Sequence, residues 1–139
     1  MPDFAVIKKK ISPYNKKIFV DGDKSISIRW ALLASQAIGK STASNLPNSE
    51  DINSTIDCLK RLGIKIIKKN NNCEIFGNGL NGFNYQKNIT INAGNSGTCG
   101  RLILGLLVAS KKKIKLEGDK SLSSRDFSRV TSPLERFGA

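Results

Sequence analysis

The chain has 139 residues, 39% of them hydrophobic, which suits a single domain with a modest core and excludes disorder along the whole chain. Its three cysteines show no CxxC spacing and it has no histidine, so neither a disulfide framework nor a zinc site is expected. Because no apolar stretch reaches the roughly 18 residues of a membrane span and the first residues do not resemble a secretory signal, we expect a cytoplasmic protein without a membrane partner.

The chain carries a net charge of +12, with 23 Lys and Arg residues against 11 Asp and Glu residues. Such an excess is typical of nucleic-acid-binding proteins, in which cationic side chains release counterions from a phosphate backbone. Much of the excess lies in short lysine runs at 8–10, 68–69 and 111–113, where a solvated surface explains it, and few aromatic side chains could stack on bases. The charge therefore favours a small anionic ligand, with a basic nucleic-acid-binding module as the alternative.

Short β-like runs alternate with amphipathic helical segments along the chain, which indicates an α/β fold. A β-like run at 18–20 leads into a turn at 22–23. A helix is predicted next, from about residue 25 to residue 38, because apolar side chains recur there at helical spacing. Gly39 is expected to end this helix.

A second helix is predicted to begin near residues 49–51, where a serine and two acidic residues suit the positive end of a helix dipole. Gly63 is expected to end it. A hairpin with a polar turn is expected at 64–69 and 73–76. It is followed by a strand at 89–91, a helix at 98–109, a strand at 114–116 and a last helix at about 127–137.

One segment of the chain is repeated. Residues Gly22–Arg29 and Gly118–Arg125 are identical at six of their eight positions. The repeat suggests successive units of related design, with a period too long for a solenoid. Because the chain ends at Gly138-Ala139, just after a helix and where the first unit leads us to expect a strand, we expect the sequence to be truncated.

The first copy of the repeat has the features of an anion-binding helix start. Its glycine allows a tight turn, and the first N–H groups of the helix, together with the helix dipole, attract an anion. Lys24 adds a positive charge, Ser25 a hydroxyl donor, and Arg29 a bidentate donor on the same helical face as Ser25. The alternative is a helix capped by its serine, with an exposed lysine and arginine.

A second strand–turn–helix junction spans Asn95–Arg101, where Gly97 would let backbone N–H groups approach an anion closely, unless the turn serves chain geometry alone. Because the chain has no histidine, only Asp, Glu, Lys, Tyr and Cys side chains could act as acid or base. The sequence pairs none of them convincingly, so we assign no catalytic residue. Asp23 and Asp119 are explained by turn and capping chemistry. Cys99 is expected to be a small buried residue, although a helix start would lower the pKa of its thiol.

Four segments carry a resemblance to a known family: Gly22–Ala34, Asn45–Gly63, Asn95–Arg101 and Gly118–Arg125. In this order they are similar to signatures of the 5-enolpyruvylshikimate-3-phosphate synthase (3-phosphoshikimate 1-carboxyvinyltransferase) family, and the similarity covers nearly the whole chain. The related UDP-N-acetylglucosamine enolpyruvyl transferases typically have Lys-Asn where this chain has Lys24-Ser25. The difference favours 3-phosphoshikimate as substrate, with the sugar-nucleotide enzyme as an alternative.

The resemblance implies binding residues for two substrates. Those implied for 3-phosphoshikimate are Lys24, Ser25 and Arg29. Those implied for phosphoenolpyruvate are Lys24, Gly97 and Arg125, with Asn95 and Arg101 in support. The family transfers the enolpyruvyl group of phosphoenolpyruvate to the 5-hydroxyl of 3-phosphoshikimate and releases phosphate, through a tetrahedral adduct. The resemblance implies no metal and no organic cofactor.

The family protein is much longer and consists of two similar domains, each an inside-out α/β barrel of repeated β-α-β-α-β-β units. By resemblance, residues 1–20 would be a strand segment of the other domain, and residues 21–139 about two units of one domain. The family's acid–base carboxylates belong to the part that is absent here, so we expect the chain alone to be inactive. The full-length protein is expected to be a monomer that does not bind nucleic acid.

Overall fold

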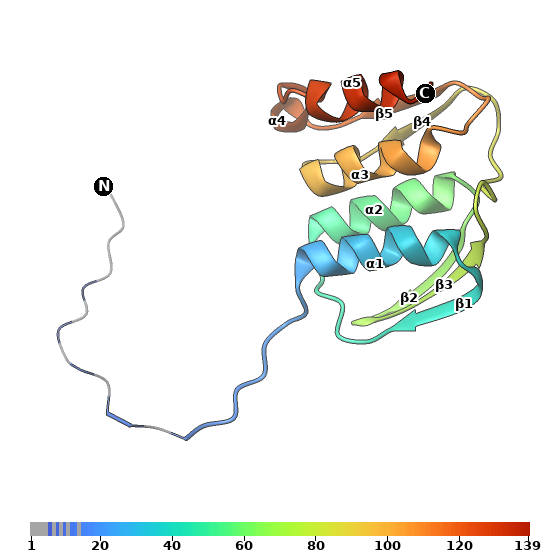
Figure 1. Ribbon diagram of the computed structural model, residues 1–139. Helices are drawn as coiled ribbons and strands as arrows, with labels where there is room; N and C mark the ends of the chain where they lie inside the picture. Colours follow the sequence, from blue (N-terminus) through green and yellow to red (C-terminus); the bar gives the residue numbers. More distant parts are fainter. Residues whose placement is uncertain (1–5, 7, 9, 11, 14) are drawn as a thin grey trace.

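The structure is a computed structural model, shown in Figure 1, and it describes residues 6, 8, 10, 12–13 and 15–139. In chain order its elements are α1 (Lys24–Gln36), β1 (Ile38–Ala43), α2 (Glu50–Arg61), β2 (Lys65–Lys69), β3 (Asn72–Asn78), β4 (Ile89–Asn92), α3 (Gly97–Leu107), β5 (Ile114–Glu117), α4 (Lys120–Ser123) and α5 (Ser128–Arg136).

From α1 onward, each helix and strand that the sequence predicts is present, with small shifts of its ends. The prediction that Gly39 ends the first helix is wrong. That helix ends at Gln36, because Ala37 is extended, with ψ of 163°, and leads the chain straight into β1, which contains Gly39. The sequence did not predict β1 or α4, since β1 is polar and largely exposed and α4 has only four residues.

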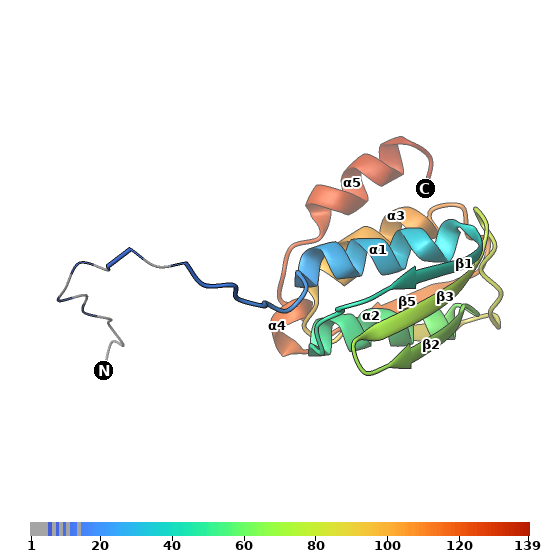
Figure 2. The same ribbon diagram turned by 90° about the horizontal axis from the view of Figure 1, so that it is seen from below.

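The β-like run at 18–20 is not a strand. Its three side chains, those of Ile18, Phe19 and Val20, are 76%, 87% and 73% exposed. Figure 2 shows the segment before α1 leading away from the helices, and among the described residues no strand pairs with it. An extended segment needs such a partner for its backbone groups, so the prediction fails here because a neighbouring strand is lacking.

The strands form two small sheets. In the first sheet β1 and β2 flank β3, both pairings are antiparallel, and Ser41 and Ile66 lie opposite Ile75. In the second sheet β4 pairs with β5 in parallel, with Ile89 opposite Ile114, and α3 forms the crossover between the two strands. The predicted α/β class and the predicted β2–β3 hairpin are thus confirmed.

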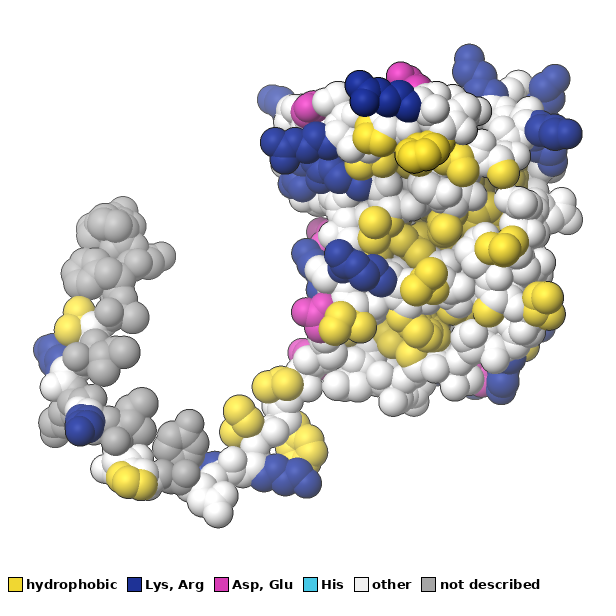
Figure 3. Space-filling view, viewed as in Figure 1, with side chains coloured by type: hydrophobic (Ala, Val, Ile, Leu, Met, Phe, Trp, Pro, Cys, Tyr) yellow, Lys and Arg dark blue, Asp and Glu magenta, His cyan; other side chains and the backbone are white. Residues whose placement is uncertain are grey.

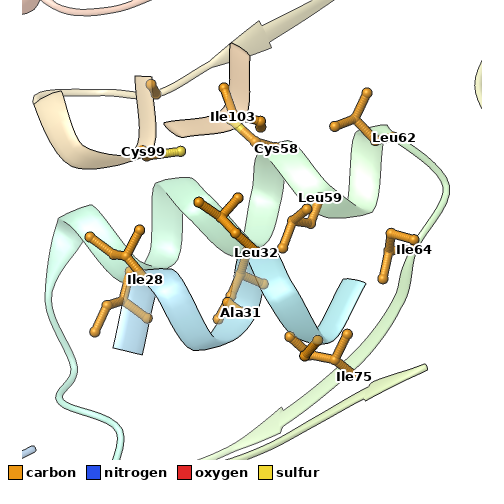
Figure 4. Close-up of a cluster of buried hydrophobic side chains, with 14 of the residues drawn as sticks. Ile28, Ala31, Leu32, Cys58, Leu59, Leu62, Ile64, Ile75, Cys99 and Ile103 are labelled. Atoms are coloured by element: carbon orange, nitrogen blue, oxygen red, sulfur yellow. The ribbon is translucent and has the colours of Figure 1, made fainter. Parts of the chain in front are cut away.

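The core lies where α1, α2 and α3 meet one another and β3. Figure 4 shows side chains from these elements directed toward a common interior. Those that it labels are at most 3% exposed, and they are Ile28, Ala31, Leu32, Cys58, Leu59, Leu62, Ile64, Ile75, Cys99 and Ile103. In α2 the buried residues include Ile52, Ile56 and Leu59, which recur at helical spacing and form the stripe that the sequence predicts.

The three longer helices of the core, α1, α2 and α3, contact one another and run in the same direction. Figure 1 shows that their N-termini therefore lie at one end of the molecule, together with the short α4. Local signals fix where α2 begins and ends: Ser49 Oγ accepts from Ile52 N at 3.4 Å, and Gly63 follows the helix with φ of +88°, as predicted. No helix in the described part of the chain is long and apolar enough to cross a membrane.

Two glycines with positive φ offer a test of this packing. A Cβ added at Gly63 would lie 2.0 Å from the carbonyl oxygen of Asn84, whereas one added at Gly39, with φ of +91°, would meet no atom within 4 Å. We expect Gly39→Ala to lower the free energy of unfolding by about 1–2 kcal/mol through its backbone conformation alone. Gly63→Ala should lower the free energy of unfolding by clearly more, because the chain near Asn84 must also move. Urea unfolding of both variants measures the difference, and equal losses would contradict the close approach at Gly63.

Candidate functional site

The two copies of the repeat begin their helices in the same way. Asp23 caps α1, its Oδ1 accepting from Ile26 N at 2.7 Å, and Asp119 caps α4, its Oδ1 accepting from Leu122 N at 2.6 Å. The capping role predicted for both aspartates is confirmed, whereas the alternative of a serine-capped helix is wrong. An Asp one residue before the helix can reach the free N–H group three residues on, so Ser25 is left inside the first turn.

In the first copy, the predicted binding residues lie on an accessible surface. Lys24 Nζ lies 2.5 Å from Asp51 Oδ2, so it links the start of α1 to the start of α2. Its side chain is 52% exposed. Arg29 Nη1 donates to the carbonyl oxygen of Ser25 at 3.1 Å, which confirms that these two residues share one face of α1. Sequence reasoning missed Asp51 as the partner of Lys24, because no local pattern connects residues so far apart in the chain.

The second junction brings two arginines against a glycine at the start of α3. Ser96 caps this helix, its Oγ accepting from Cys99 N at 3.2 Å. A Cβ built on Gly97 would lie 2.7 Å from Arg125 Nη1 and 3.0 Å from Arg101 Nη1. The bare α-carbon of Gly97 therefore leaves room for two guanidinium groups beside the free N–H groups of the helix start.

Each of these arginines has its own supports. Arg101 donates to the carbonyl oxygen of Asp126 at 3.3 Å and lies over the ring of Phe127, 5.2 Å from its centroid. Arg125 Nη2 donates to Asn95 Oδ1 at 3.2 Å and to Ser121 Oγ at 3.4 Å. Phe127 was not foreseen as a support, since only the fold brings it to α3.

Asn95 in turn depends on the second copy of the repeat. Its Nδ2 donates to Asp119 Oδ2 at 2.6 Å, so the aspartate that caps α4 also holds a side chain at the start of α3. The hydrogen bond from the Leu122 N–H lowers the pKa of the Asp119 carboxyl most, and Asn95 and Arg125 lower it further. Asp119 is therefore an anion throughout the neutral pH range.

The thiols of Cys58 and Cys99 lie in the core behind these helix starts, and both residues are 0% exposed. The expectation that Cys99 is a small buried residue is confirmed. The single S–H group of Cys58 donates to the carbonyl oxygen of Asn92 at 3.3 Å. Within the described part of the chain, no three His, Cys, Asp or Glu residues are placed to hold a metal ion.

The helix starts together form a cationic surface at one end of the molecule. Figure 3 shows Lys and Arg side chains concentrated at the upper left, on the side where the helices begin, with Asp and Glu side chains between and below them. Lys24, Ser25 and Arg29 lie at the start of α1, while Gly97, Arg101 and Arg125 meet at the start of α3. Free backbone N–H groups and cationic side chains that face solvent together favour anionic ligands such as phosphates and carboxylates.

Comparison with known proteins identifies the family to which this surface belongs. The sequence model of one family, described as EPSP synthase (3-phosphoshikimate 1-carboxyvinyltransferase), matches residues 8–139. The chain belongs to the EPSP synthase family. The resemblance carried by the four sequence segments is thereby confirmed.

Individual relatives agree with this assignment. The chain is 38% identical over 133 residues to the 3-phosphoshikimate 1-carboxyvinyltransferase of Syntrophomonas wolfei, a match that covers 96% of this chain and 31% of the relative. It is 39% identical over 132 residues to the enzyme of the same name from Streptococcus pyogenes serotype M1, a match that covers 95% of this chain and 30% of the relative. The solved EPSP synthase from Acinetobacter baumannii superposes with a TM-score of 0.82 at 34% identity, covering 89% of this chain and 28% of that one. The chain thus spans about 30% of the length of these curated relatives.

The close approach at Gly97 can be tested with a second glycine of the same helix. A Cβ at Gly105 would meet no atom within 4 Å, so Gly105→Ala should raise the free energy of unfolding by about 0.5–1 kcal/mol, because alanine favours the helix. Gly97→Ala should bring no such gain, because its methyl group displaces the guanidinium groups of Arg101 and Arg125. Urea unfolding compares the two variants, and an equal gain at both positions would contradict the packing of the arginines on Gly97.

Proposed function

We propose that this chain provides part of the substrate site of an enzyme that transfers the enolpyruvyl group of phosphoenolpyruvate to the 5-hydroxyl of 3-phosphoshikimate, with release of phosphate. Membership of the EPSP synthase family supports the reaction. The observation that carries the proposal is the pair of guanidinium groups against Gly97 at the start of α3. Phosphoenolpyruvate has a phosphate and a carboxylate, and bidentate arginines are suited to both groups.

The substrate contacts that we propose fall into two sets. The set for 3-phosphoshikimate is Lys24, Ser25 and Arg29. The set for phosphoenolpyruvate is Lys24, Gly97 and Arg125, with Asn95 and Arg101 in support. In this proposal Lys24, whose side chain is 52% exposed, exchanges its ion pair with Asp51 for contacts with the substrates.

The chemistry that these residues would supply is orientation and electrostatic stabilisation. Both substrates are anions, and the adduct between them is tetrahedral and negatively charged. Fixed cationic side chains and helix N–H groups lower the energy of such a species because they need not reorganise when it forms. The proposed reaction uses no metal and no organic cofactor, and we assign no catalytic acid or base to this chain.

We also propose how the chain fits into the larger architecture of its family. The order α1-β1-α2-β2-β3 agrees with a β-α-β-α-β-β unit without its first strand, and β4-α3-β5 followed by α4 and α5 agrees with the beginning of a second unit. Residues 21–139 would then form about two units of one inside-out α/β barrel. Residues 1–20 would belong to the other domain, and the exposure of Ile18, Phe19 and Val20 supports a role for them in pairing elsewhere.

Two other functions remain as rivals of this proposal. A UDP-N-acetylglucosamine 1-carboxyvinyltransferase shares the proposed architecture, and the net charge of +12 would suit a nucleic-acid-binding module. Lys24-Ser25 in place of Lys-Asn supports 3-phosphoshikimate over the sugar nucleotide. We infer a cytoplasmic enzyme that acts as a monomer in its full-length form, as its resemblance to the family implies.

Ligand titrations followed by NMR test the proposed contacts. 3-Phosphoshikimate should shift the backbone signals of Lys24, Ser25 and Arg29, and phosphoenolpyruvate those at the start of α3. Lys24→Ala should weaken the binding of both ligands about tenfold or more, and Arg125→Ala should weaken mainly the binding of phosphoenolpyruvate. Each variant loses a charge-assisted hydrogen bond to the ligand. Lys113→Ala is the matched control, because it removes an exposed lysine before β5, beyond the far end of α3.

The same titration separates the rivals. Stronger binding of UDP-N-acetylglucosamine than of 3-phosphoshikimate would favour the sugar-nucleotide enzyme. Salt-dependent binding of arbitrary duplex DNA that persists in the double variant Lys24→Ala with Arg125→Ala would favour the nucleic-acid module.

Turnover is the last test of the proposal. Because the chain spans about 30% of the length of its curated relatives, we expect it to bind substrates without converting them. Phosphate release from the isolated chain, supplied with both substrates, should stay at the background level. Release at the rate of an ordinary enzyme would show that the chain holds a complete catalytic site.

A further inference from the structure

The two copies of the repeat differ in what their aspartates contact. The carboxylate of Asp23 accepts from Ile26 N through one oxygen, which is its capping contact. Asp119 makes the equivalent contact with Leu122 N, and its other oxygen accepts from Asn95 Nδ2 at 2.6 Å. The second contact cannot be part of capping, because it leads from α4 to the start of α3.

The amide of Asn95 is fixed at both ends. Its Nδ2 faces the Asp119 carboxylate, which only accepts, and its Oδ1 faces the Arg125 guanidinium, which only donates. Both contacts would be lost if the amide turned over, because Nδ2 would then face a donor and Oδ1 an acceptor. The three side chains therefore form a chain of charge-assisted hydrogen bonds in which the negative charge of Asp119 sets the direction of the amide.

We propose that Asp119 is a positioning residue for Arg125, and that it acts through Asn95 to hold the guanidinium group over Gly97. This proposal rests on the proposed function, in which Arg125 contacts phosphoenolpyruvate. Because the Asn95 amide lies between the Asp119 carboxylate and the Arg125 guanidinium, Arg125 is oriented without a direct ion pair to a carboxylate. Among the described residues Arg125 forms no ion pair, so its charge is available to an anionic ligand, whereas Lys24 is paired directly with Asp51.

Asp119→Asn separates positioning from capping. Asparagine is as good a cap as aspartate, so its Oδ1 can still accept from Leu122 N. Its Nδ2, however, would point at Asn95 Nδ2, and two donors cannot bond to each other. The Asn95 amide is then expected to turn over, which points its Nδ2 at Arg125 and breaks the contact that holds the guanidinium group. Asp23→Asn is the matched control, because it makes the same change at a carboxylate that only caps.

The experiment compares the two variants with the unmodified chain in three measurements: urea unfolding, side-chain NMR signals of Asn95 and Arg125 without ligand, and phosphoenolpyruvate affinity. We expect both variants to unfold at similar urea concentrations. Asp119→Asn alone should shift the Asn95 and Arg125 side-chain signals. It should also weaken the binding of phosphoenolpyruvate about tenfold, which is the loss expected for one hydrogen bond to a charged group.

The outcomes distinguish this proposal from the proposed function. Unchanged Asn95 and Arg125 signals in Asp119→Asn overturn the positioning role, and so does an equal loss of affinity in both variants. If the unmodified chain does not bind phosphoenolpyruvate, the proposed function of Arg125 fails. The ligand-free signals then still decide whether Asp119 orients Arg125 through Asn95.

Discussion

The common direction of α1, α2 and α3 is the constraint on which the site depends. Each helix leaves free N–H groups and a positive dipole end at its start, and parallel packing collects these at one end of the molecule. The core enforces the arrangement, because Ile28, Leu59 and Ile103, one from each helix, are 0% exposed. The same apolar packing that forms the core therefore also gathers the positive helix ends.

Two like charges at the start of α3 need a physical explanation. Arg101 and Arg125 both approach the position that a Gly97 side chain would take, where their charges repel. Neutral groups hold them there: the Phe127 ring and a carbonyl oxygen for Arg101, and the Asn95 amide and a hydroxyl for Arg125. Since neither arginine forms a direct ion pair among the described residues, an anion between them would relieve the repulsion.

The parts of the structure that sequence could predict are those with local causes. Ser49 and Gly63 mark the ends of α2 through their own hydrogen-bonding and backbone properties, and the repeat exposed the two equivalent helix starts. The contacts of Lys24 with Asp51 and of Asn95 with Asp119 depend on tertiary packing, which no spacing rule reveals. The strand β1 was missed for a similar reason, since pairing with β3 rather than its own polar residues makes it a strand.

The two copies differ at two positions, and at both positions the burial of the side chain differs. Where the first copy has Ile28, which is 0% exposed in the core, the second has Ser124, which is exposed. The buried isoleucine anchors a helix of 13 residues, so Arg29 stays on its surface and donates back to Ser25. The second copy instead buries Leu122, which is 2% exposed where the first copy has Ile26 at 69%, and α4 stops after four residues with Ser124 as its C-cap. Arg125 follows the end of α4 and reaches Asn95 at the start of α3, so the two copies place their arginines differently because they bury different positions: Ile28 in the first copy and Leu122 in the second.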